Sequence, residues 1–223
     1  MTYHLLDMYK IYEHPFDTNT LEDNVVIIDV LRAATVASIV CMKKPLVYYM
    51  SSDEDKIKEL YNENPLSITI GKPEKNKLFT YAYVNSPTRI WDGDFTNKVV
   101  LHRSRACGGM LDQLQNKNVL IAGFCNVSAV SQYIVDSNLN WDIVCCGFNA
   151  EEPNDEDKLC ADILTKYVTN NQNHIYKKLE KSKSVTFFEK NQPEYPKEDI
   201  KICLTLDLVS FVMKGHNNII SVI

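Results

Sequence analysis

The segment Asn24-Val25-Val26-Ile27-Ile28-Asp29-Val30-Leu31-Arg32-Ala33-Ala34-Thr35 decides the fold of this chain. Its run of β-branched residues, 25–28, predicts a strand buried on both faces, as strands inside parallel sheets are. The small side chains from Ala33 to Ser38 predict a helix packed closely against that sheet. Asp29 and Arg32 lie between the two elements, where open α/β sheets collect their ligands. They are therefore candidate site residues, unless Asp29 only caps the helix and Arg32 only pairs with a surface carboxylate.

Length and composition are ordinary for a globular protein and exclude several classes. The chain has 223 residues, of which 45% are hydrophobic and 24% charged. Its net charge of −5 argues against a nucleic-acid partner, because phosphate backbones are bound by clustered Lys and Arg. No apolar stretch approaches about 18 residues, and no signal-peptide pattern is present, so no membrane contact is expected. Seven cysteines without a C-x-x-C pair predict a reducing, cytoplasmic location and no zinc site.

Strand and helix patterns alternate along the whole chain. Strands are expected at 2–12, 25–30, 46–50, 67–70, 98–101, 118–124, 142–147 and 219–222, and helices at about 33–41, 53–62, 108–115, 127–136, 156–168, 174–183 and 197–204. Residues 72–98 are expected to be irregular, and 192–196 to form a linker. The alternation predicts one domain, 1–223, with the α/β class of a three-layer α/β/α sandwich and a mixed, mostly parallel sheet. Exposed aromatics in the irregular segment, Tyr81, Tyr83 and Trp91, would cover a site or build a homodimer contact.

Polar residues follow four of the predicted strands. They are Asp29 with Arg32; Arg103 with Ser104 and Arg105; Asn126 with Ser128; and Gly147 with the acidic loop Asn149 to Asp157. If the strands are parallel, these groups line one edge of the sheet. Arginines beside helix N-termini favour an anion such as phosphate. Asp29 together with Glu156 or Asp157 would suit Mg²⁺, which prefers few protein oxygens plus water and phosphate. The combination predicts phosphoryl chemistry, in which an aspartate attacks or activates water.

Each of these features has a purely structural alternative. The acidic run 155–157 favours a helix start through the helix dipole alone. Asn126 could be an ordinary N-cap, residues 85–87 a turn, and His102 either a base or a structural histidine. The motifs of P-loop nucleotidases, Rossmann dehydrogenases and serine hydrolases are all missing from the sequence, so these classes lose support.

Five short motifs occur in order between Val25 and Asp207. They are Ile28-Asp29-Val30-Leu31-Arg32-Ala33-Ala34-Thr35; Asn85-Ser86-Pro87; 123–129; Cys146-Gly147 with 156–161; and Glu198-Asp199-Ile200 with Cys203 and Asp207. Together they resemble the 2-phosphosulfolactate phosphatase family, a Mg²⁺-dependent phosphatase family linked to coenzyme M biosynthesis. The resemblance implies an α/β/α sandwich that hydrolyses the phosphate monoester of a small acid, with or without a sulfonate group.

The resemblance says less about which residue acts, and the roles of individual residues are our own interpretation. Asp29 would be the metal ligand or nucleophile, and Arg32 would hold phosphate. The substrate pocket would be completed by Asn85, Ser86, Arg103, Ser104, Arg105 and Asn126, with Glu156 and Asp157 as further metal ligands. This chain has Gly71-Lys72 where the family often has G-E. Such departures leave open a catalytically inactive or altered-substrate paralogue that binds an anionic ligand or a protein partner.

Overall fold

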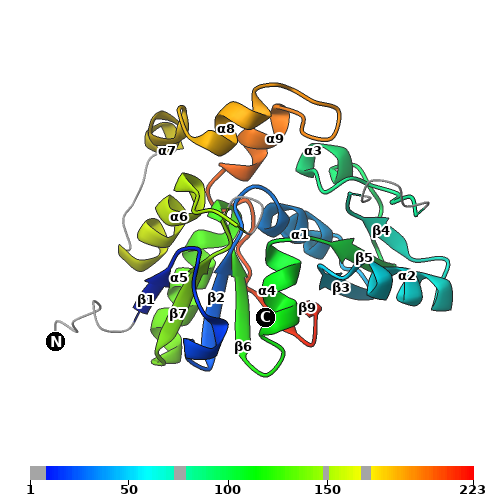
Figure 1. Cartoon of the computed structure of the whole chain (residues 1–223), viewed down its shortest axis with the longest axis horizontal. Helices are drawn as coiled ribbons and strands as arrows, with labels where there is room; N and C mark the ends of the chain where they lie inside the picture. The colour runs from blue at the N-terminus through cyan, green and yellow to red at the C-terminus, as the bar shows by residue number, and fades with distance from the viewer. Residues whose placement is uncertain (1–8, 73–78, 148–150, 167–171) are drawn as a thin grey trace.

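The computed structural model describes residues 9–72, 79–147, 151–166 and 172–223, and one sheet passes through them (Figure 1). Across these residues the sheet has nine strands in the order β1-β7-β2-β6-β8-β9-β3-β5-β4. The strands are β1 Tyr9–Tyr12, β2 Asn24–Ile28, β3 Val47–Ser51, β4 Ile68–Ile70, β5 Val99–Arg103, β6 Asn118–Ala122, β7 Trp141–Cys145, β8 Met213–His216 and β9 Ile219–Val222. The predicted α/β class with a mixed, mostly parallel sheet is confirmed.

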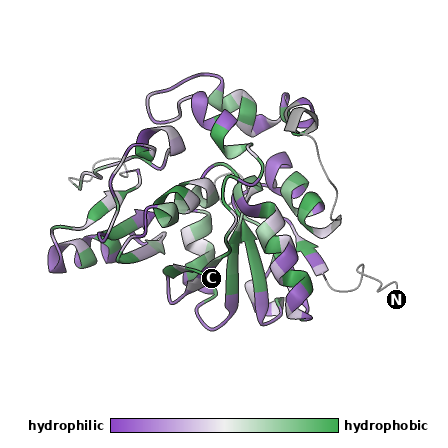
Figure 2. Ribbon diagram, turned by 180° about the vertical axis from the view of Figure 1, so that it is seen from behind, coloured by the Kyte–Doolittle hydropathy of each residue, from purple (hydrophilic) through white to green (hydrophobic). Residues whose placement is uncertain are grey.

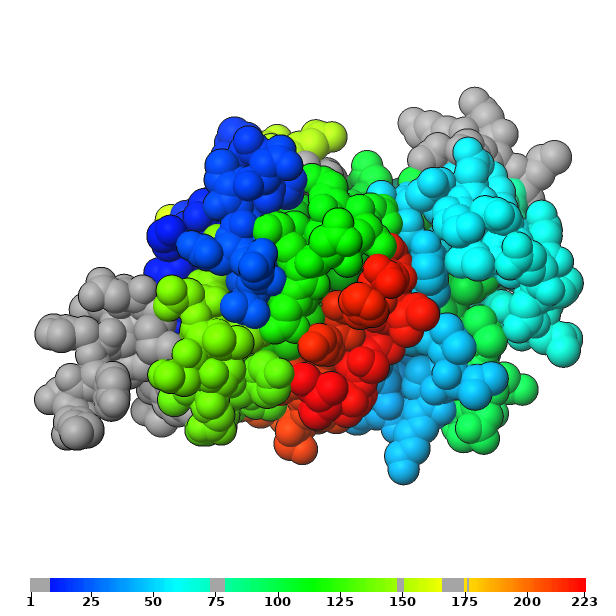
Figure 3. Space-filling model, turned by 90° about the horizontal axis from the view of Figure 1, so that it is seen from below, coloured from blue at the N-terminus to red at the C-terminus, as the bar shows by residue number. Residues whose placement is uncertain are grey.

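The sheet consists of two parallel groups joined by an antiparallel hairpin. Strands β1, β7, β2 and β6 form one group, and β3, β5 and β4 form the other. The β8–β9 hairpin pairs antiparallel with both, but its contact with β3 is the single pair Tyr49–Ile219. Figure 3 shows this C-terminal segment, in red, on the molecular surface between the two groups. In Figure 1 the first group runs upward and the second runs across the view, so their carboxyl ends meet near the centre.

Helices cover both faces of the sheet. They are α1 Ala33–Met42, α2 Glu54–Glu63, α3 Pro87–Ile90, α4 Cys107–Gln113, α5 Val127–Ser137, α6 Asp155–Lys166, α7 Gln172–Leu179, α8 Lys183–Phe188 and α9 Glu198–Cys203. Strand β2 divides the core: Val25 and Ile27 pack in one hydrophobic cluster with α1 and α4, and Val26 and Ile28 pack in another with α5 and α6. Figure 2 shows the strands largely green, with mixed colours on the helices. Layers on both faces agree with a three-layer sandwich.

Helix α1 is enclosed rather than amphipathic. All residues from Ala33 to Cys41 are buried, as expected for a helix that is apolar on every side. Alanine and serine side chains allow this helix to lie close to the sheet. The strand and helix predicted from residues 25–41 are therefore confirmed, and they place the Asp29–Arg32 turn at the centre of the molecule.

Three short elements differ from the sequence prediction. Strand β8 lacks β-branched residues and so carries no strand pattern, but the turn after it is informative. Asn217 and Asn218 have φ angles of 48° and 63°, which asparagine tolerates, and such pairs are typical of hairpins. Helix α3, four residues long, lies in the segment expected to be irregular, and helix α8, six residues long, begins where the helix expected at 174–183 ends and was not predicted. The parts of the predictions at 2–8, 73–78, 149–150 and 167–168 lie outside the described residues.

The structure also shows the environments of the aromatic residues and cysteines considered in the sequence analysis. Tyr81 is buried, with 8% of its surface exposed, and Trp91 is 42% exposed, so the three aromatics do not form one exposed group. All seven cysteines are buried and unpaired, as predicted for core thiols. Within the described ranges, no helix combines the length and apolar character needed to cross a membrane.

Burial of β2 on both faces predicts a large cost for truncating it. Ile28 is completely buried, so Ile28→Ala should lower the free energy of unfolding by about 3–4 kcal/mol through lost contacts and a cavity. Ile11, on edge strand β1, is 41% exposed, and Ile11→Ala should cost less than about 1 kcal/mol. Urea denaturation of both variants measures the difference. Equal losses would contradict the central position of β2.

Candidate active site

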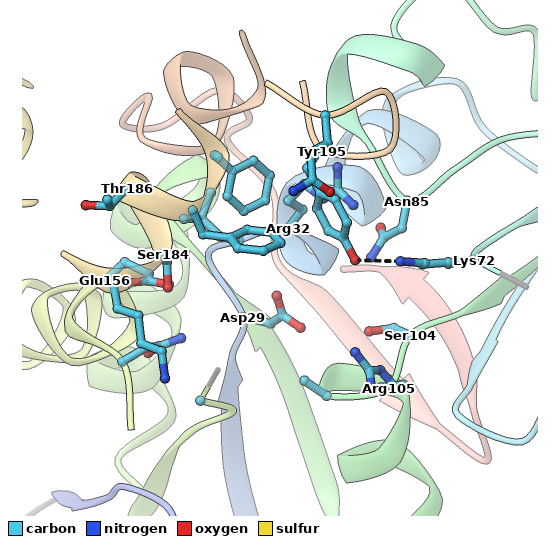
Figure 4. A pocket seen from close by; sticks show the side chains of 18 of the residues that line it. Asp29, Arg32, Lys72, Asn85, Ser104, Arg105, Glu156, Ser184, Thr186 and Tyr195 are labelled. Atoms are coloured by element: carbon cyan, nitrogen blue, oxygen red, sulfur yellow. Dashed lines mark hydrogen bonds between the residues drawn. The ribbon is translucent and has the colours of Figure 1, made fainter. Parts of the chain in front are cut away.

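A cavity of about 960 Å³ lies where the carboxyl ends of the two strand groups meet (Figure 4). Its lining comes from the segments after β2, β4, β5 and β7, from α8, and from the loop before α9. Two acidic side chains, Asp29 and Glu156, face a larger set of basic ones. The basic side chains are Arg32, Lys72, Arg103, Arg105, Lys183 and Lys190.

Asp29 both caps a helix and lines the cavity. Its Oδ1 accepts a hydrogen bond from the backbone N–H of Ala33 at 3.0 Å, and its Oδ2 accepts one from Cys107 at 3.3 Å. The carboxylate thus joins the first turns of α1 and α4, which follow strands in different groups. Burial raises the pKa of Asp29, whereas the two N–H groups and the charge of Arg32 lower it. The structural and functional interpretations of Asp29 are therefore compatible.

Arg32 is held in a buried ion pair, which replaces the surface pair considered from sequence. Its Nη1 donates to Asp199 Oδ2 at 2.7 Å and to the carbonyl of Glu194 at 2.9 Å. The guanidinium carbon lies 5.2 Å from the ring centre of Phe188 and 4.8 Å from that of Tyr195, within cation–π range. Among the described residues Nε and Nη2 have no partner, so these N–H groups can serve a ligand in the cavity.

Asp199 organises the support behind Arg32. It is fully buried, and its Oδ1 accepts hydrogen bonds from Ser86 Oγ at 2.8 Å and from the Thr88 N–H at 3.0 Å. Ser86 also caps α3 through Arg89 N. The predicted substrate contact of Ser86 is therefore corrected: its hydroxyl holds Asp199 and does not line the cavity. The Glu198-Asp199-Ile200 motif includes this carboxylate, but the sequence did not indicate that Asp199 holds Arg32.

The segment after β5 reaches the cavity as predicted. Arg103, Ser104 and Arg105 all line it. Arg103 donates from Nε to the Ser52 carbonyl at 3.1 Å and from Nη1 to the Lys72 carbonyl at 3.0 Å. Asn85 also lines the cavity, with its Oδ1 3.0 Å from His102 Nε2. These four residues stay candidates for ligand contacts.

Asn126 and Asp157 lie behind the cavity wall, contrary to the sequence prediction. Both are buried, and their polar atoms serve backbone groups. Asn126 accepts from the Gly123 N–H at 3.1 Å and donates to the Ile121 carbonyl at 3.0 Å, which shapes the turn after β6. Asp157 accepts from the N–H groups of Val30 at 2.9 Å and Gly147 at 3.0 Å. It therefore ties the end of β2 to the end of β7.

Several cavity residues were not recognised in the sequence. Lys72 pairs with Glu194 at 2.7 Å and approaches the Tyr195 hydroxyl at 3.3 Å, shown dashed in Figure 4. The segment 192–196, predicted to be a linker, thus reaches across to the segment after β4. Lys183 and Lys190 come from α8 and the residues after it. Their spacing in a charged stretch resembles a solvated helix face, so only the fold assigns them to a cavity.

Glu156 is the least satisfied carboxyl group of the site. It is 1% exposed, and its Oε2 has no hydrogen-bond partner among the described residues. Burial raises its pKa to about 7, and the charge of Asp29 adds to the shift. Burial likewise raises the pKa of Asp157 well above its ordinary value, with contributions from Glu156 and Asp29. Three mutually repelling buried carboxyls are costly unless protonated or compensated by a cation.

Fold and cavity define an α/β protein with a cavity rich in basic side chains at the ends of parallel strands, beside a group of carboxylates. The sequence profile of the family described as 2-phosphosulpholactate phosphatase matches residues 10–218, and the chain therefore belongs to that family of phosphatases. The resemblance inferred from the five motifs is confirmed.

Related proteins carry the same description. A probable 2-phosphosulfolactate phosphatase of Caldanaerobacter subterraneus subsp. tengcongensis is 27% identical to this chain, over 96% of this chain and 97% of the relative. One from Bacillus subtilis is 26% identical over 85% of each chain. One from Thermoplasma acidophilum is 25% identical over 47% of each. At such identities, side chains in the cavity can differ while the fold is kept.

The raised pKa of Glu156 predicts a pH-dependent stability change. A folded-state pKa near 7, against an ordinary 4.5, leaves stability complete below about pH 4.5 and reduces it as the pH rises towards 7. In EDTA, Glu156→Gln should therefore be more stable than wild type at pH 8, by about 2–3 kcal/mol, and nearly equal at pH 4.5. Urea denaturation at the two pH values measures this. The exposed Glu63→Gln is the control, and a gain that does not vary with pH would contradict the assignment.

The buried ion pair predicts a large loss when its carboxylate is removed. Asp199→Ala leaves the Arg32 guanidinium buried without its counter-ion and should lower the free energy of unfolding by about 3–5 kcal/mol. The half-exposed Lys72–Glu194 pair serves as a matched control, because Glu194→Ala should cost less than about 1 kcal/mol. Chemical denaturation compares the two variants. A small effect of Asp199→Ala would show that Arg32 does not depend on this pair.

Proposed function

We propose that the chain is a Mg²⁺-dependent phosphatase that hydrolyses the phosphate monoester of a small acid, with or without a sulfonate group. The observation that carries this proposal is the lining of the cavity. A chain of net charge −5 places arginine and lysine side chains around one cavity, next to two carboxylates. Together with membership of a phosphatase family, this favours an anionic substrate and its hydrolysis.

Arg32 is the best candidate for binding the phosphoryl group. Guanidinium groups bind phosphate oxygens in a planar, often paired geometry, and Arg32 has N–H groups without partners in the part of the chain that the structure describes. Its rotation is restricted by Asp199 and by the rings of Phe188 and Tyr195. A preorganised donor of this kind stabilises charge that develops in the transition state without a cost for rearrangement.

The residues present fit a Mg²⁺ ion held by few protein oxygens. Glu156 offers a buried oxygen that has no hydrogen-bond partner within the described ranges, and Asp29 lines the same cavity. Within the described residues, no three His, Cys, Asp or Glu side chains form a metal-holding group, so an ion bound here would take most of its ligands from water and phosphate. We therefore assign the ion to Asp29 and Glu156, and leave Asp157 as their support. Bound there, Mg²⁺ would neutralise phosphate charge.

In the proposed reaction the ester P–O bond breaks and water supplies the new oxygen on phosphorus. Asp29 either accepts a proton from that water or attacks phosphorus itself, in which case water releases the phosphate in a second step. The alcohol oxygen of the acid leaves and takes up a proton. Arg32 and the segment after β5 hold the phosphoryl oxygens throughout, because both line the cavity around Asp29.

Lys72 favours an altered substrate as the second candidate. It lies in the Gly71-Lys72 segment, where the family resemblance implies a glutamate, and it lines the cavity with an ammonium group that pairs with Glu194. A substrate with an additional anionic group would benefit from that charge. An inactive paralogue would keep the binding and lose the hydrolysis.

Phosphate release from a panel of phosphorylated hydroxy acids, with Mg²⁺ or with EDTA, tests the proposal. Turnover is expected only with Mg²⁺. Asp29→Asn should reduce it by about 100-fold to 10,000-fold, while the free energy of unfolding falls by only about 1–2 kcal/mol. The exposed Asp136→Asn should change neither quantity.

An active phosphatase and an inactive paralogue have different outcomes in this assay. Binding of an acid from the panel in calorimetry without phosphate release would favour the inactive paralogue. Thermal unfolding in a Mg²⁺ titration tests the ion separately from activity. Mg²⁺ should raise the melting temperature of wild type more than that of Glu156→Gln, and equal shifts would remove Glu156 from the metal site.

A further inference from the structure

A buried histidine connects the hydrophobic core to the cavity through a chain of hydrogen bonds. His102, on β5, is completely buried. Its Nδ1 lies 2.7 Å from the hydroxyl of Tyr48 on β3, and its Nε2 lies 3.0 Å from Oδ1 of Asn85, which lines the cavity. The Tyr48 and His102 rings are nearly parallel, at an angle of 5°. The proposed reaction does not use His102 directly.

The protonation states of His102 and Tyr48 follow from their burial. Burial lowers the pKa of His102 to about 3, with the charge of Arg32 adding to the shift, so the imidazole is neutral at ordinary pH. Burial raises the pKa of Tyr48 well above its ordinary value, so the phenol keeps its proton. A neutral imidazole has one N–H donor and one acceptor nitrogen. The general-base interpretation of His102 therefore loses support.

The Tyr48 hydroxyl decides which nitrogen carries the proton. Among the described residues, that hydroxyl has no acceptor other than His102 Nδ1. A buried donor is costly when unpaired, so the phenol donates to Nδ1 and the imidazole proton lies on Nε2. Nε2–H then donates to Asn85, and only the amide oxygen of Asn85 can accept it.

The orientation of the Asn85 amide follows. With Oδ1 facing His102, the NH₂ group of Asn85 is left for the cavity, where Figure 4 shows Asn85 beside Lys72 and above Ser104. The opposite orientation would present a carbonyl oxygen to an anion and repel it. We propose that His102 is a positioning residue that, held by Tyr48, fixes the Asn85 carboxamide as a neutral N–H donor to an oxygen of the phosphorylated substrate.

This inference rests on the proposed phosphatase function, so its first test does not involve a substrate. Long-range ¹H–¹⁵N NMR of the imidazole rings distinguishes Nε2–H from Nδ1–H tautomers, and the chain has five histidines. Comparison with His102→Leu assigns the signal. A neutral Nε2–H tautomer between pH 5 and 8 is expected. An Nδ1–H tautomer, or titration of His102 in this range, would overturn the proposal.

The second test measures inorganic phosphate binding by calorimetry in the presence of Mg²⁺. Asn85→Ala should raise the Kd for phosphate about tenfold, and Tyr48→Phe, which removes only the hydroxyl, about threefold or more. Tyr49→Phe is the control: Tyr49 is on the same strand but packs in the cluster with Leu101, and its Kd should equal that of wild type. In an Asn85→Ala background, Tyr48→Phe should have no further effect.

The outcomes separate this inference from the proposed function. Positioning through Asn85 would be overturned if Tyr48→Phe alone left the Kd for phosphate unchanged. It would also be overturned if Tyr48→Phe and Asn85→Ala raised the Kd independently of each other. Wild-type protein that binds no phosphate would contradict the proposed function and the anion contact together, whichever tautomer NMR reports. Phosphate binding by wild type with an Nδ1–H tautomer would leave the function standing and remove the role of His102.

Discussion

The buried ion pair between Arg32 and Asp199 is the interaction on which the candidate site depends. Arg32 is the residue just before α1, and Asp199 belongs to α9, far along the chain. Asp199 also accepts hydrogen bonds from the start of α3, so one carboxylate joins three segments. Burying two charges is costly, and only close geometry with additional hydrogen bonds offsets that cost. What the pair provides is a rigid arginine at the wall of a cavity.

Buried carboxylates and basic side chains lie together in the rest of the site. Asp29, Glu156 and Asp157 are all buried, the charges of Glu156 and Asp29 add to the raised pKa of Asp157, and basic side chains line the same cavity. Asp157 and Asn126 use their polar atoms on backbone groups, so they hold the strand ends in place. Glu156, by contrast, keeps an oxygen with no hydrogen-bond partner among the residues that the structure describes. Such an arrangement gives up stability in the free protein, and binding of the proposed cation and anion would return it.

Local patterns were sufficient for most of the fold and for the centre of the site. β-Branched residues 25–28 predicted the buried strand, and the small residues after Arg32 predicted α1, because both patterns reflect burial of the element itself. Asp29, Arg32, Asn85, Glu156 and the segment after β5 do line the cavity. Residue type alone did not reveal the hydrogen-bond partners of two other predicted site residues: Ser86 serves Asp199, far along the chain, and Asn126 serves the backbone of its own turn.

The sequence by itself determined the α/β class, the family, and the turn that carries Asp29 and Arg32. These depend on periodicity and on short motifs, which are properties of neighbouring residues. Only the tertiary structure decided that two parallel strand groups meet at their carboxyl ends, and that Lys72, Lys183 and Tyr195 border the cavity. It also placed Tyr48 and His102 behind Asn85. Such relations join residues far apart along the chain, and packing of the sheet brings them within hydrogen-bond distance.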